Sequence, residues 1–186
     1  MKHIANRSKI LISLVVLIVL FYSCSQGGQV DNKPITQIMK DSLPLRNPYY
    51  SRTDTAVLHV SDEEWKKVLP EEVYFISRKK DTERAFTGKY WNFEGLGTYY
   101  CAACGNPLFR SDAKFASSCG WPSFYKALNS NSVVYEDDNS YGMKRTEVMC
   151  GRCRGHLGHI FDDGPPPTHR RFCMNSIVLE FEPDQK

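Results

Sequence analysis

Seven cysteines carry most of the reactive chemistry in this sequence, and four of them form two CxxC motifs. These are Cys101-Ala-Ala-Cys104 and Cys150-Gly-Arg-Cys153. Each motif can wrap one side of a tetrahedral ion, and two together complete a four-cysteine zinc site. Because four thiolates leave no open coordination position for a substrate, we expect one structural Zn²⁺ per chain.

Two other interpretations fit the same spacing. A CxxC motif is also the active pair of thioredoxin-like redox proteins, and two disulfides would be stable outside the cytoplasm. The glycines beside the motifs, Gly105 and Gly151, favour zinc. Metal-binding turns need a tight backbone that leaves amide groups near the sulfurs, and glycine permits such turns.

Two further cysteines, Cys119 and Cys173, lie outside both CxxC motifs and outside the N-terminal segment that contains Cys24. A structural disulfide in an exported protein would account for such a pair. The alternative is a nucleophilic thiol with a second thiol that resolves its oxidised form. The neighbours of each cysteine favour this alternative.

Cys173 lies in RRFCMNSIVLEF, residues 170–181, a run that is typical of a strand. Side chains alternate along a strand, so Arg171, Cys173 and Asn175 should share one face. A neighbouring cation favours the thiolate and lowers a cysteine pKa from its usual value of about 8.5. We therefore expect a nucleophilic Cys173, with the Asn175 amide near the reacting oxygen.

Two histidines and a tryptophan are candidates for the rest of such a site. GHLGHIF, residues 155–161, places His156 and His159 in a predicted glycine-rich loop, and imidazoles serve in acid–base catalysis. Spacing alone does not select one of them. Trp121 follows Cys119 by two residues. A tryptophan often packs in a core, but beside a thiol it can line an apolar pocket for a methyl group.

The elements that hold these residues are predicted to be mainly strands. Ser61 and Glu64 form a capping box at the start of a helix, while the pattern of EEVYFISRKK, residues 71–80, is ambiguous. Short aromatic and β-branched runs separated by turn residues follow, as is typical of antiparallel strands. These runs are GTYYCAACGNPLF, SVVYED, TEVMCGRC and FCMNSIVLEF. We predict a small, mainly β domain with short N-terminal helices.

The N-terminus is typical of a targeting segment. The basic start MKHIANRSK precedes ILISLVVLIVLFY. That apolar run is shorter than the roughly 20 residues of a membrane span and suits a signal-peptide core. The following Ser23-Cys24 resembles the lipobox of bacterial lipoproteins, in which a lipid is attached to the cysteine. The alternative is an uncleaved N-terminal anchor.

Four parts of the chain follow from this pattern. We predict a lipoprotein-type signal peptide over 1–23, lipid attachment at Cys24, a flexible linker over 24–55 and a single domain over 56–186. Such a domain would be tethered to a membrane of the bacterial cell envelope and face away from the cytoplasm.

The composition limits the range of functions. The chain has 186 residues, of which 41% are hydrophobic, and this suits one globular domain with a real core. Its net charge of +3 comes without a long Lys/Arg run, so nothing points to nucleic acid. Nothing indicates an obligate partner either, and we expect a monomer.

Five segments in order resemble the B-type peptide methionine sulfoxide reductases, which reduce the R epimer of methionine sulfoxide. They are TERAFTGKYW, CAACGNPLF, CGWPSF, CGRCRGHLGHIFDDGP and RRFCMNS. The resemblance spans about Ser61 to Glu182. It implies a fold of two antiparallel β-sheets, a β-tent, with a structural zinc clip away from the active site.

The resemblance also assigns roles. It implies that Cys173 attacks the sulfoxide sulfur, with His156 and His159 as the histidines that match the family's proton donors. The Cys173 sulfenic acid would condense with Cys119, and a thioredoxin-like donor would reduce the disulfide. The remaining matches line the site and are Trp121, Phe161, Arg171 and Asn175.

Two other functions remain to be compared with this one. A non-catalytic zinc-scaffold binding module of the cell envelope predicts that Cys119 and Cys173 are inert or permanently bridged. A general thiol–disulfide oxidoreductase predicts that Cys101 and Cys104 cycle and that chelators have no effect. The favoured activity is thiol-dependent reduction of methionine (R)-sulfoxide in proteins or peptides.

Overall fold

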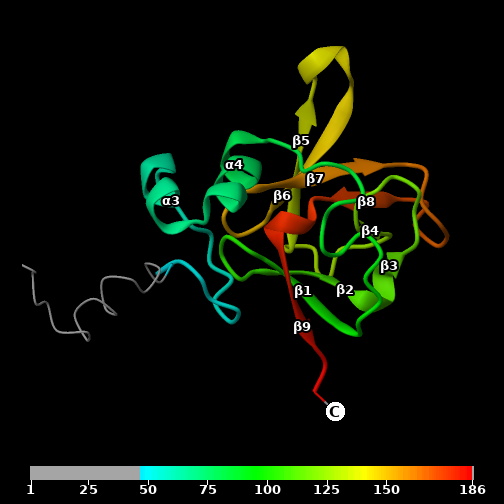
Figure 1. The fold of residues 1–186 in the computed structure, drawn as a ribbon, viewed down its shortest axis with the longest axis horizontal. Coiled ribbons are helices and arrows are strands. Elements are labelled where there is room, and N and C mark those ends of the chain that lie inside the picture. The colour runs from blue at the N-terminus through cyan, green and yellow to red at the C-terminus, as the bar shows by residue number, and fades with distance from the viewer. Residues whose placement is uncertain (1–46, 186) are drawn as a thin grey trace, which may run out of the picture. The chain divides into compact units, whose positions relative to one another are not determined.

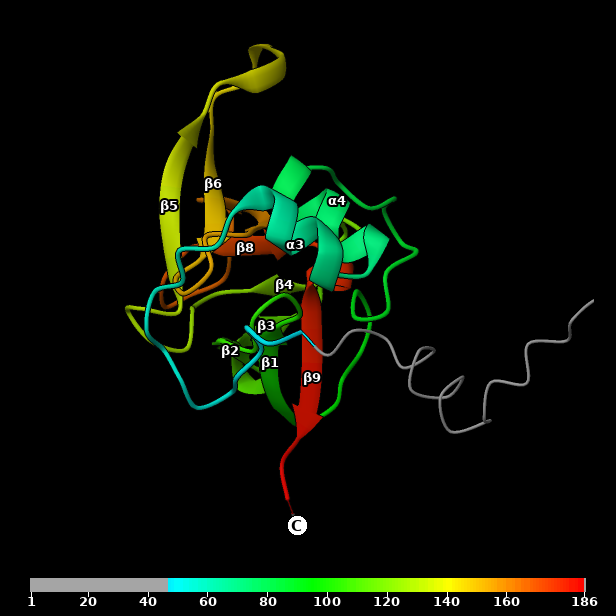
Figure 2. The same cartoon turned by 90° about the vertical axis from the view of Figure 1, so that its left-hand side faces the viewer.

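A computed structural model describes residues 47–185, which fold into two antiparallel β-sheets preceded by two short helices (Figures 1 and 2). The three-stranded sheet has the order β2 (Pro107–Arg110), β1 (Gly97–Cys101), β9 (Leu179–Pro183). The six-stranded sheet has the order β3 (Lys114–Phe115), β4 (Ser123–Phe124), β8 (Arg171–Met174), β7 (His156–Phe161), β6 (Arg145–Cys150), β5 (Val133–Asp138). The predicted fold class is confirmed.

Two helices form as the local sequence dictates. Helix α3 (Asp62–Val68) begins at Ser61, whose Oγ accepts a hydrogen bond from the Glu64 backbone N–H at 3.3 Å. This is the capping interaction that the sequence predicted. The ambiguous segment is helix α4 (Glu71–Lys79), which packs against β7 and the 3-10 turn Ser176–Val178. Neither helix is long and apolar enough to cross a membrane, and the same holds throughout residues 47–185.

The run of residues 170–181 is two strands, not the single strand that its apolar pattern predicted. β8 belongs to the six-stranded sheet and β9 to the three-stranded sheet, and the turn Ser176–Val178 carries the chain from one to the other. Arg171 and Cys173 do share the half-buried face of β8. Asn175 lies just beyond the strand, so its place is set by the turn and not by strand alternation.

The predicted histidine loop is also a strand. β7 pairs with β6 on one side and with β8 on the other, so His156 and His159 are held within the sheet. The glycine that suggested a loop serves a different purpose. A Cβ at Gly158 would overlap the Cys173 carbonyl oxygen, so the absence of a side chain lets β7 and β8 approach each other.

Aromatic rings fill the space between the two sheets. Tyr99 on β1 and Phe109 on β2 are fully buried and contact Phe124 on β4. The Phe109 and Phe124 rings are stacked with their centroids 4.4 Å apart. Because β4 pairs with β8, this packing fixes the strand that carries Cys173 against the core.

The folded region begins earlier than residue 56, the predicted start of the domain. Asn47 Nδ2 donates to the Ala103 carbonyl at 2.7 Å, and the Tyr49 ring packs edge-on against Trp65. The prolines suggested a linker, whereas the aromatic and amide side chains between them attach residues 47–55 to the domain. The predicted signal peptide, Cys24 and the first part of the linker lie outside the described residues.

Candidate active site and metal centre

The four CxxC cysteines form one buried cluster, here called the zinc clip: Cys101, Cys104, Cys150 and Cys153. Their sulfurs all lie within 4.8 Å of one another, with Cys101–Cys153 at 3.8 Å and Cys104–Cys150 at 3.6 Å. Tetrahedral thiolates about 2.3 Å from Zn²⁺ have sulfurs about 3.8 Å apart. The cluster therefore fits one structural zinc ion.

The zinc clip joins the two sheets. Cys101 ends β1 and Cys104 lies in the turn that leads to β2, while Cys150 ends β6 and Cys153 lies in the turn that leads to β7. The sulfur contacts at 3.8 and 3.6 Å each join one CxxC motif to the other, and all four thiols are free. Local CxxC disulfides would instead bring sulfurs of the same motif to about 2.05 Å. The geometry thus favours the metal over both rival interpretations.

The two turns of the zinc clip have the same backbone hydrogen bond, but the residue with positive φ is a glycine in one and an arginine in the other. The backbone N–H of the fourth residue after the first cysteine bonds to that cysteine's carbonyl, from Gly105 at 2.7 Å and from Arg154 at 2.9 Å. Both residues have positive φ, +78° and +60°. Gly151 therefore is not the counterpart of Gly105. Its lack of a side chain instead lets the Asn131 carbonyl approach.

The remaining two cysteines of the described chain lie together. Cys119 Sγ, before β4, is 3.4 Å from Cys173 Sγ on β8, and both are free and half-buried. Their separation exceeds a disulfide bond of about 2.05 Å but needs only a small side-chain rotation to close. The chain thus presents two thiols that can cycle between a dithiol and a disulfide.

Strand register aligns polar groups in a row across the six-stranded sheet. Glu147 on β6 lies opposite His159 on β7, His159 lies opposite Cys173 on β8, and Cys173 lies opposite Ser123 on β4. Directly opposed residues have Cβ atoms about 5 Å apart. The register alone therefore places the His159 imidazole next to the Cys173 thiol.

A cavity of about 130 Å³, here called the catalytic cavity, opens beside Cys173. Five predicted site residues line it: Trp121, His159, Phe161, Cys173 and Asn175. Three residues that the sequence did not single out, Thr82, Arg145 and Gly158, complete its wall. Two aromatic rings beside a nucleophile and an imidazole can receive a small group with an apolar part and a polar part.

His156 lies apart from the catalytic cavity. It is 3% exposed, and its Nδ1 is 2.7 Å from the equally buried Glu147 carboxylate. Glu147 also accepts a hydrogen bond from Lys80 Nζ at 2.7 Å. Burial lowers the pKa of His156 although Glu147 raises it, so the ring is neutral at neutral pH. The His156 ring is adjacent to the His159 ring, with centroids 5.4 Å apart, but only His159 lines the catalytic cavity.

The chain resembles known proteins over this same region. The SelR domain model matches residues 69–183. The chain belongs to the SelR domain family. A peptide methionine sulfoxide reductase MsrB from Thiobacillus denitrificans is 55% identical over 123 residues, which make up 66% of this chain and 93% of the relative. A peptide methionine sulfoxide reductase MsrB from Acinetobacter baylyi is 50% identical over 69% of this chain and 93% of the relative. One from Methanosarcina barkeri is 52% identical over 68% of this chain and 89% of the relative.

In this SelR domain, Asp138 orients His159. Asp138 Oδ2 lies 2.7 Å from His159 Nε2 and 2.5 Å from Arg145 Nη2. Hydrogen bonds from Ser140 and then His159 and Arg145 hold the pKa of Asp138 well below its usual range, so it is a carboxylate. It therefore accepts a hydrogen bond from the Nε2–H group of His159, which leaves Nδ1 free to exchange a proton with the substrate. No local pattern singles out Asp138, because its partners lie on the β5–β6 hairpin and on β7 and meet only in the folded sheet.

Asn175 is more constrained than the sequence suggested. Its Oδ1 accepts from the Glu83 backbone N–H at 3.0 Å, and its Nδ2 donates to the Leu157 carbonyl at 3.0 Å. Only the second Nδ2 hydrogen can serve a reacting oxygen. Trp121 Nε1 donates to the Glu83 carbonyl at 3.2 Å. Glu83 thus positions two residues of the catalytic cavity, a role the sequence did not reveal.

The expected lowering of the Cys173 pKa is wrong for the reduced pair. Burial and the adjacent Cys119 raise the pKa of Cys173 to about 12, although Arg171 acts in the opposite direction. Arg171 is largely engaged elsewhere, because it makes two 2.8 Å bonds to the Asp163 carboxylate and stacks over Phe161. Cys173 is therefore a thiol at neutral pH.

Cys119 is the more acidic member of the pair. Burial raises the pKa of Cys119, but hydrogen bonds from the Ser117 hydroxyl at 2.9 Å and the Ser123 hydroxyl at 3.4 Å outweigh it, and the pKa falls to about 7. A substantial fraction of Cys119 is then thiolate at neutral pH. A thiol whose pKa lies near the ambient pH is the best attacking group in thiol exchange.

Proposed function

We propose that this SelR domain reduces the R epimer of methionine sulfoxide in peptides and proteins, with Cys173 as the nucleophile and Cys119 as the resolving thiol. The observation that carries the proposal is the pair of free thiols 3.4 Å apart beside an aromatic cavity. The relatives named methionine sulfoxide reductases support the reaction class. A binding module with inert cysteines would need neither the reactive pair nor the cavity.

The first step transfers oxygen from sulfur to sulfur. The sulfoxide methyl would lie against Trp121 and Phe161, with the sulfur facing Cys173. Cys173 attacks that sulfur and takes the oxygen as a sulfenic acid, and methionine leaves with two more electrons. The thiol proton of Cys173 balances the proton on the sulfenic oxygen. His159, opposite Cys173, is placed to carry it to the poor leaving oxygen.

The second step regenerates the enzyme. The Cys119 thiolate attacks the Cys173 sulfenic acid, a disulfide forms and water leaves. A thioredoxin-like dithiol then reduces the disulfide by thiol exchange. The zinc clip supplies structure only, since its four thiolates leave no position for a substrate. We further propose that the domain is a monomer. A lipid attached to Cys24 would anchor it to a membrane of the bacterial cell envelope.

The direct test of the reaction is turnover of both epimers. A short peptide containing racemic methionine sulfoxide is incubated with the zinc-bound protein and a dithiol, and each epimer is followed by chiral chromatography. We expect only the R epimer to disappear. Reduction of both epimers, or of the S epimer alone, would refute the stereochemical assignment, and no reduction by the folded protein would refute the activity.

Replacing Cys119 with serine should separate the two steps. The variant should still form about one methionine per enzyme in a single turnover, because Cys173 remains, but should lose turnover supported by a thioredoxin-like donor. A sulfenic-acid reagent should label Cys173, and mass spectrometry would detect the adduct. Ser130→Ala, on an exposed turn, is the control. A burst much below one methionine per enzyme would contradict the resolving role of Cys119.

Replacing His159 with glutamine should lower kcat by about 100-fold, the usual contribution of a positioned proton donor. The loss should fall mainly on kcat, since the ring acts on the oxygen as it leaves. Peptide kinetics across pH measure it, with the exposed His59→Gln as a matched control. If His156→Gln lowered kcat as much without lowering the melting temperature, the assignment of the two histidines would have to be reversed.

A further inference from the structure

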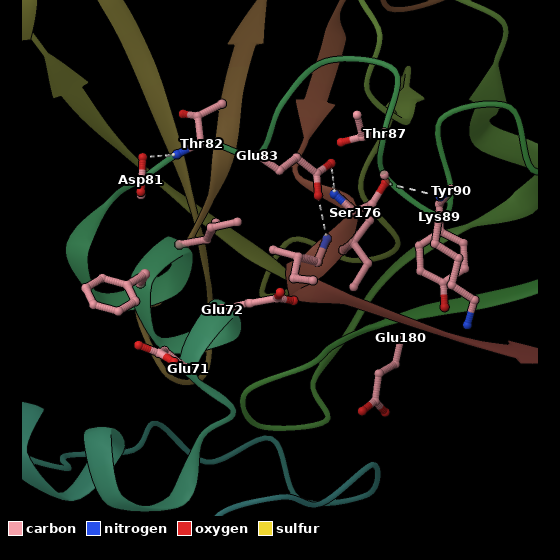
Figure 3. A pocket seen from close by; sticks show the side chains of 15 residues that line it. Glu71, Glu72, Asp81, Thr82, Glu83, Thr87, Lys89, Tyr90, Ser176 and Glu180 are labelled. Atoms are coloured by element: carbon pink, nitrogen blue, oxygen red, sulfur yellow. Dashed lines mark hydrogen bonds between the residues drawn. The ribbon is translucent and has the colours of Figure 1, made fainter.

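Two larger cavities flank the catalytic cavity. One of about 550 Å³, the hairpin cavity, lies between the turn after α4 and the β5–β6 hairpin, and it shares Thr82, Arg145 and His159 with the catalytic cavity. The other, of about 750 Å³, is the helix cavity, which runs beside α4 (Figure 3). Asp81 and Thr82 line both larger cavities, and Thr82 lines all three. A peptide that places methionine sulfoxide in the catalytic cavity and crosses this turn would have its neighbouring residues over the two larger cavities.

The hairpin cavity has an excess of negative charge. Its lining holds five carboxylates and three cations. Arg145 is paired with Asp138, Lys80 with Glu147, and Lys79 with Asp62, which lies outside the cavity. Asp81 and Asp137 have no ion-pair partner among the described residues, and Glu136 has only Lys80, 3.8 Å away. The unbalanced charge faces solvent beside the catalytic cavity.

The lining of the helix cavity also has an excess of negative charge. Figure 3 shows Glu71 and Glu72 at the start of α4 and Asp81 in the turn that follows it, all bordering the cavity. Across residues 47–185, neither of these glutamates has a cation within ion-pair distance, and Lys89 is the single cation lining this cavity. Glu83 and Glu180 also line it, but their carboxylates are occupied by two backbone N–H groups and by Arg52 respectively. The three remaining carboxylates of this cavity, those of Glu71, Glu72 and Asp81, therefore outnumber its one cation.

We propose that these cavities form a peptide groove, centred on Asp81, that selects methionine sulfoxide flanked by Lys or Arg. The proposal rests on the proposed function, since it concerns the polypeptide on either side of the reacting side chain. In an extended peptide, side chains two residues apart point to the same side, about 7 Å apart. Cationic side chains two positions before and after the methionine sulfoxide would therefore face the carboxylates of the two cavities.

The β5–β6 hairpin gives the groove an outer wall. Figures 1 and 2 show that it extends beyond the rest of the six-stranded sheet, with the 3-10 turn Ser140–Gly142 at its tip. Tyr141 on this tip is 92% exposed, and Met143 is 42% exposed. Both line the hairpin cavity. They offer apolar contact for the stems of long cationic side chains, whose charged ends reach the carboxylates.

The test compares three peptides that differ only at these two positions, with Lys, Gln or Glu on both sides of R-methionine sulfoxide. At about 0.01 M ionic strength we expect kcat/KM to follow Lys > Gln > Glu, with about tenfold between Lys and Glu. At about 0.15 M the ratio should shrink to about threefold or less, because exposed charges are screened. The double variant Asp81→Asn with Glu136→Gln should lose most of the preference. The amide introduced at position 81 would keep the side-chain oxygen that accepts the Thr82 N–H.

The control is Asp112→Asn, a carboxylate on an exposed turn outside all three cavities, which should leave the ratio unchanged. Equal rates for the Lys and Glu peptides, a preference for Glu, or an equal effect of the control would overturn the groove while leaving the reductase activity intact. If the folded, zinc-bound protein reduced none of the three peptides, the proposed function itself would fail, and the groove with it.

Discussion

Replacing Cys173 with serine should reduce turnover of methionine sulfoxide by about 10⁴-fold or more, the scale of losses seen when a catalytic nucleophile is removed. A hydroxyl is a poor nucleophile at its ordinary pKa. Serine also cannot take up the sulfoxide oxygen, whereas the cysteine sulfur takes it up and becomes a sulfenic acid. The remaining cavity would still bind the substrate. Peptide kinetics with chiral detection measure the loss.

The variant should fold like the parent, and this makes the loss interpretable. Cys173 is only half-buried, and its backbone pairing with β7 and β4 does not depend on the side chain. Zinc content, circular dichroism and the melting temperature should therefore match those of the parent protein. Appreciable turnover in such a variant would mean that another group is the nucleophile. Cys119 would then be the first candidate, because its pKa is about 7.

The thiol chemistry also has a pH dependence with a defined sign. Cys119 has its pKa lowered to about 7, so its thiolate is lost as the pH falls through that value. Resolution of the sulfenic acid should therefore slow below about pH 7. Oxygen transfer to Cys173 does not need the Cys119 thiolate. A transition with its midpoint near pH 7 should accordingly be visible in multiple-turnover rates and absent from the first turnover.

Chemistry-bearing residues were predictable where they depend on residue type and short spacing. The zinc clip and the pair formed by Cys119 and Cys173 follow from counting cysteines and recognising CxxC, and the structure brings each group together. The capping box at Ser61 likewise depends on only four residues. The segment resemblance added the order of the motifs, which no single pattern supplies.

What the sequence could not supply depends on long-range packing. The apolar and β-branched residues of 170–181 are typical of one strand, and nothing local shows that the chain changes sheets at Ser176–Val178. The glycines around His156 suggested flexibility, whereas Gly158 permits close contact between two strands. The prediction of a lowered pKa for Cys173 beside Arg171 was wrong, because the position of Arg171 along β8 does not reveal that Asp163 engages it or that Cys173 is half-buried beside Cys119. Each error arises where burial or a distant partner outweighs the local pattern.

Removing zinc should unfold the domain. Structural zinc contributes about 10–16 kcal/mol of apparent binding free energy in small zinc-dependent folds, and whole domains are stable by only about 5–15 kcal/mol. Here the zinc clip joins the turn of one sheet to the turn of the other. It also anchors the start of the folded region, since Arg152, between two of its cysteines, donates to the Tyr49 and Cys104 carbonyls at 2.7 and 2.6 Å. Without the ion, both tethers would be lost together.

The measurement combines metal content with thermal unfolding. Purified protein should contain about one zinc per chain, and Cys101→Ser should abolish zinc binding together with the cooperative melting transition. Prolonged chelation of the parent under mildly denaturing conditions should release the ion and the near-ultraviolet circular dichroism signal at the same rate. The double variant Cys119→Ser with Cys173→Ser is the matched control, because it removes two thiols while leaving the zinc clip whole. If that control lost zinc, or if metal-free parent melted as cooperatively as the holoprotein, the four cysteines would not form the structural tie between the sheets.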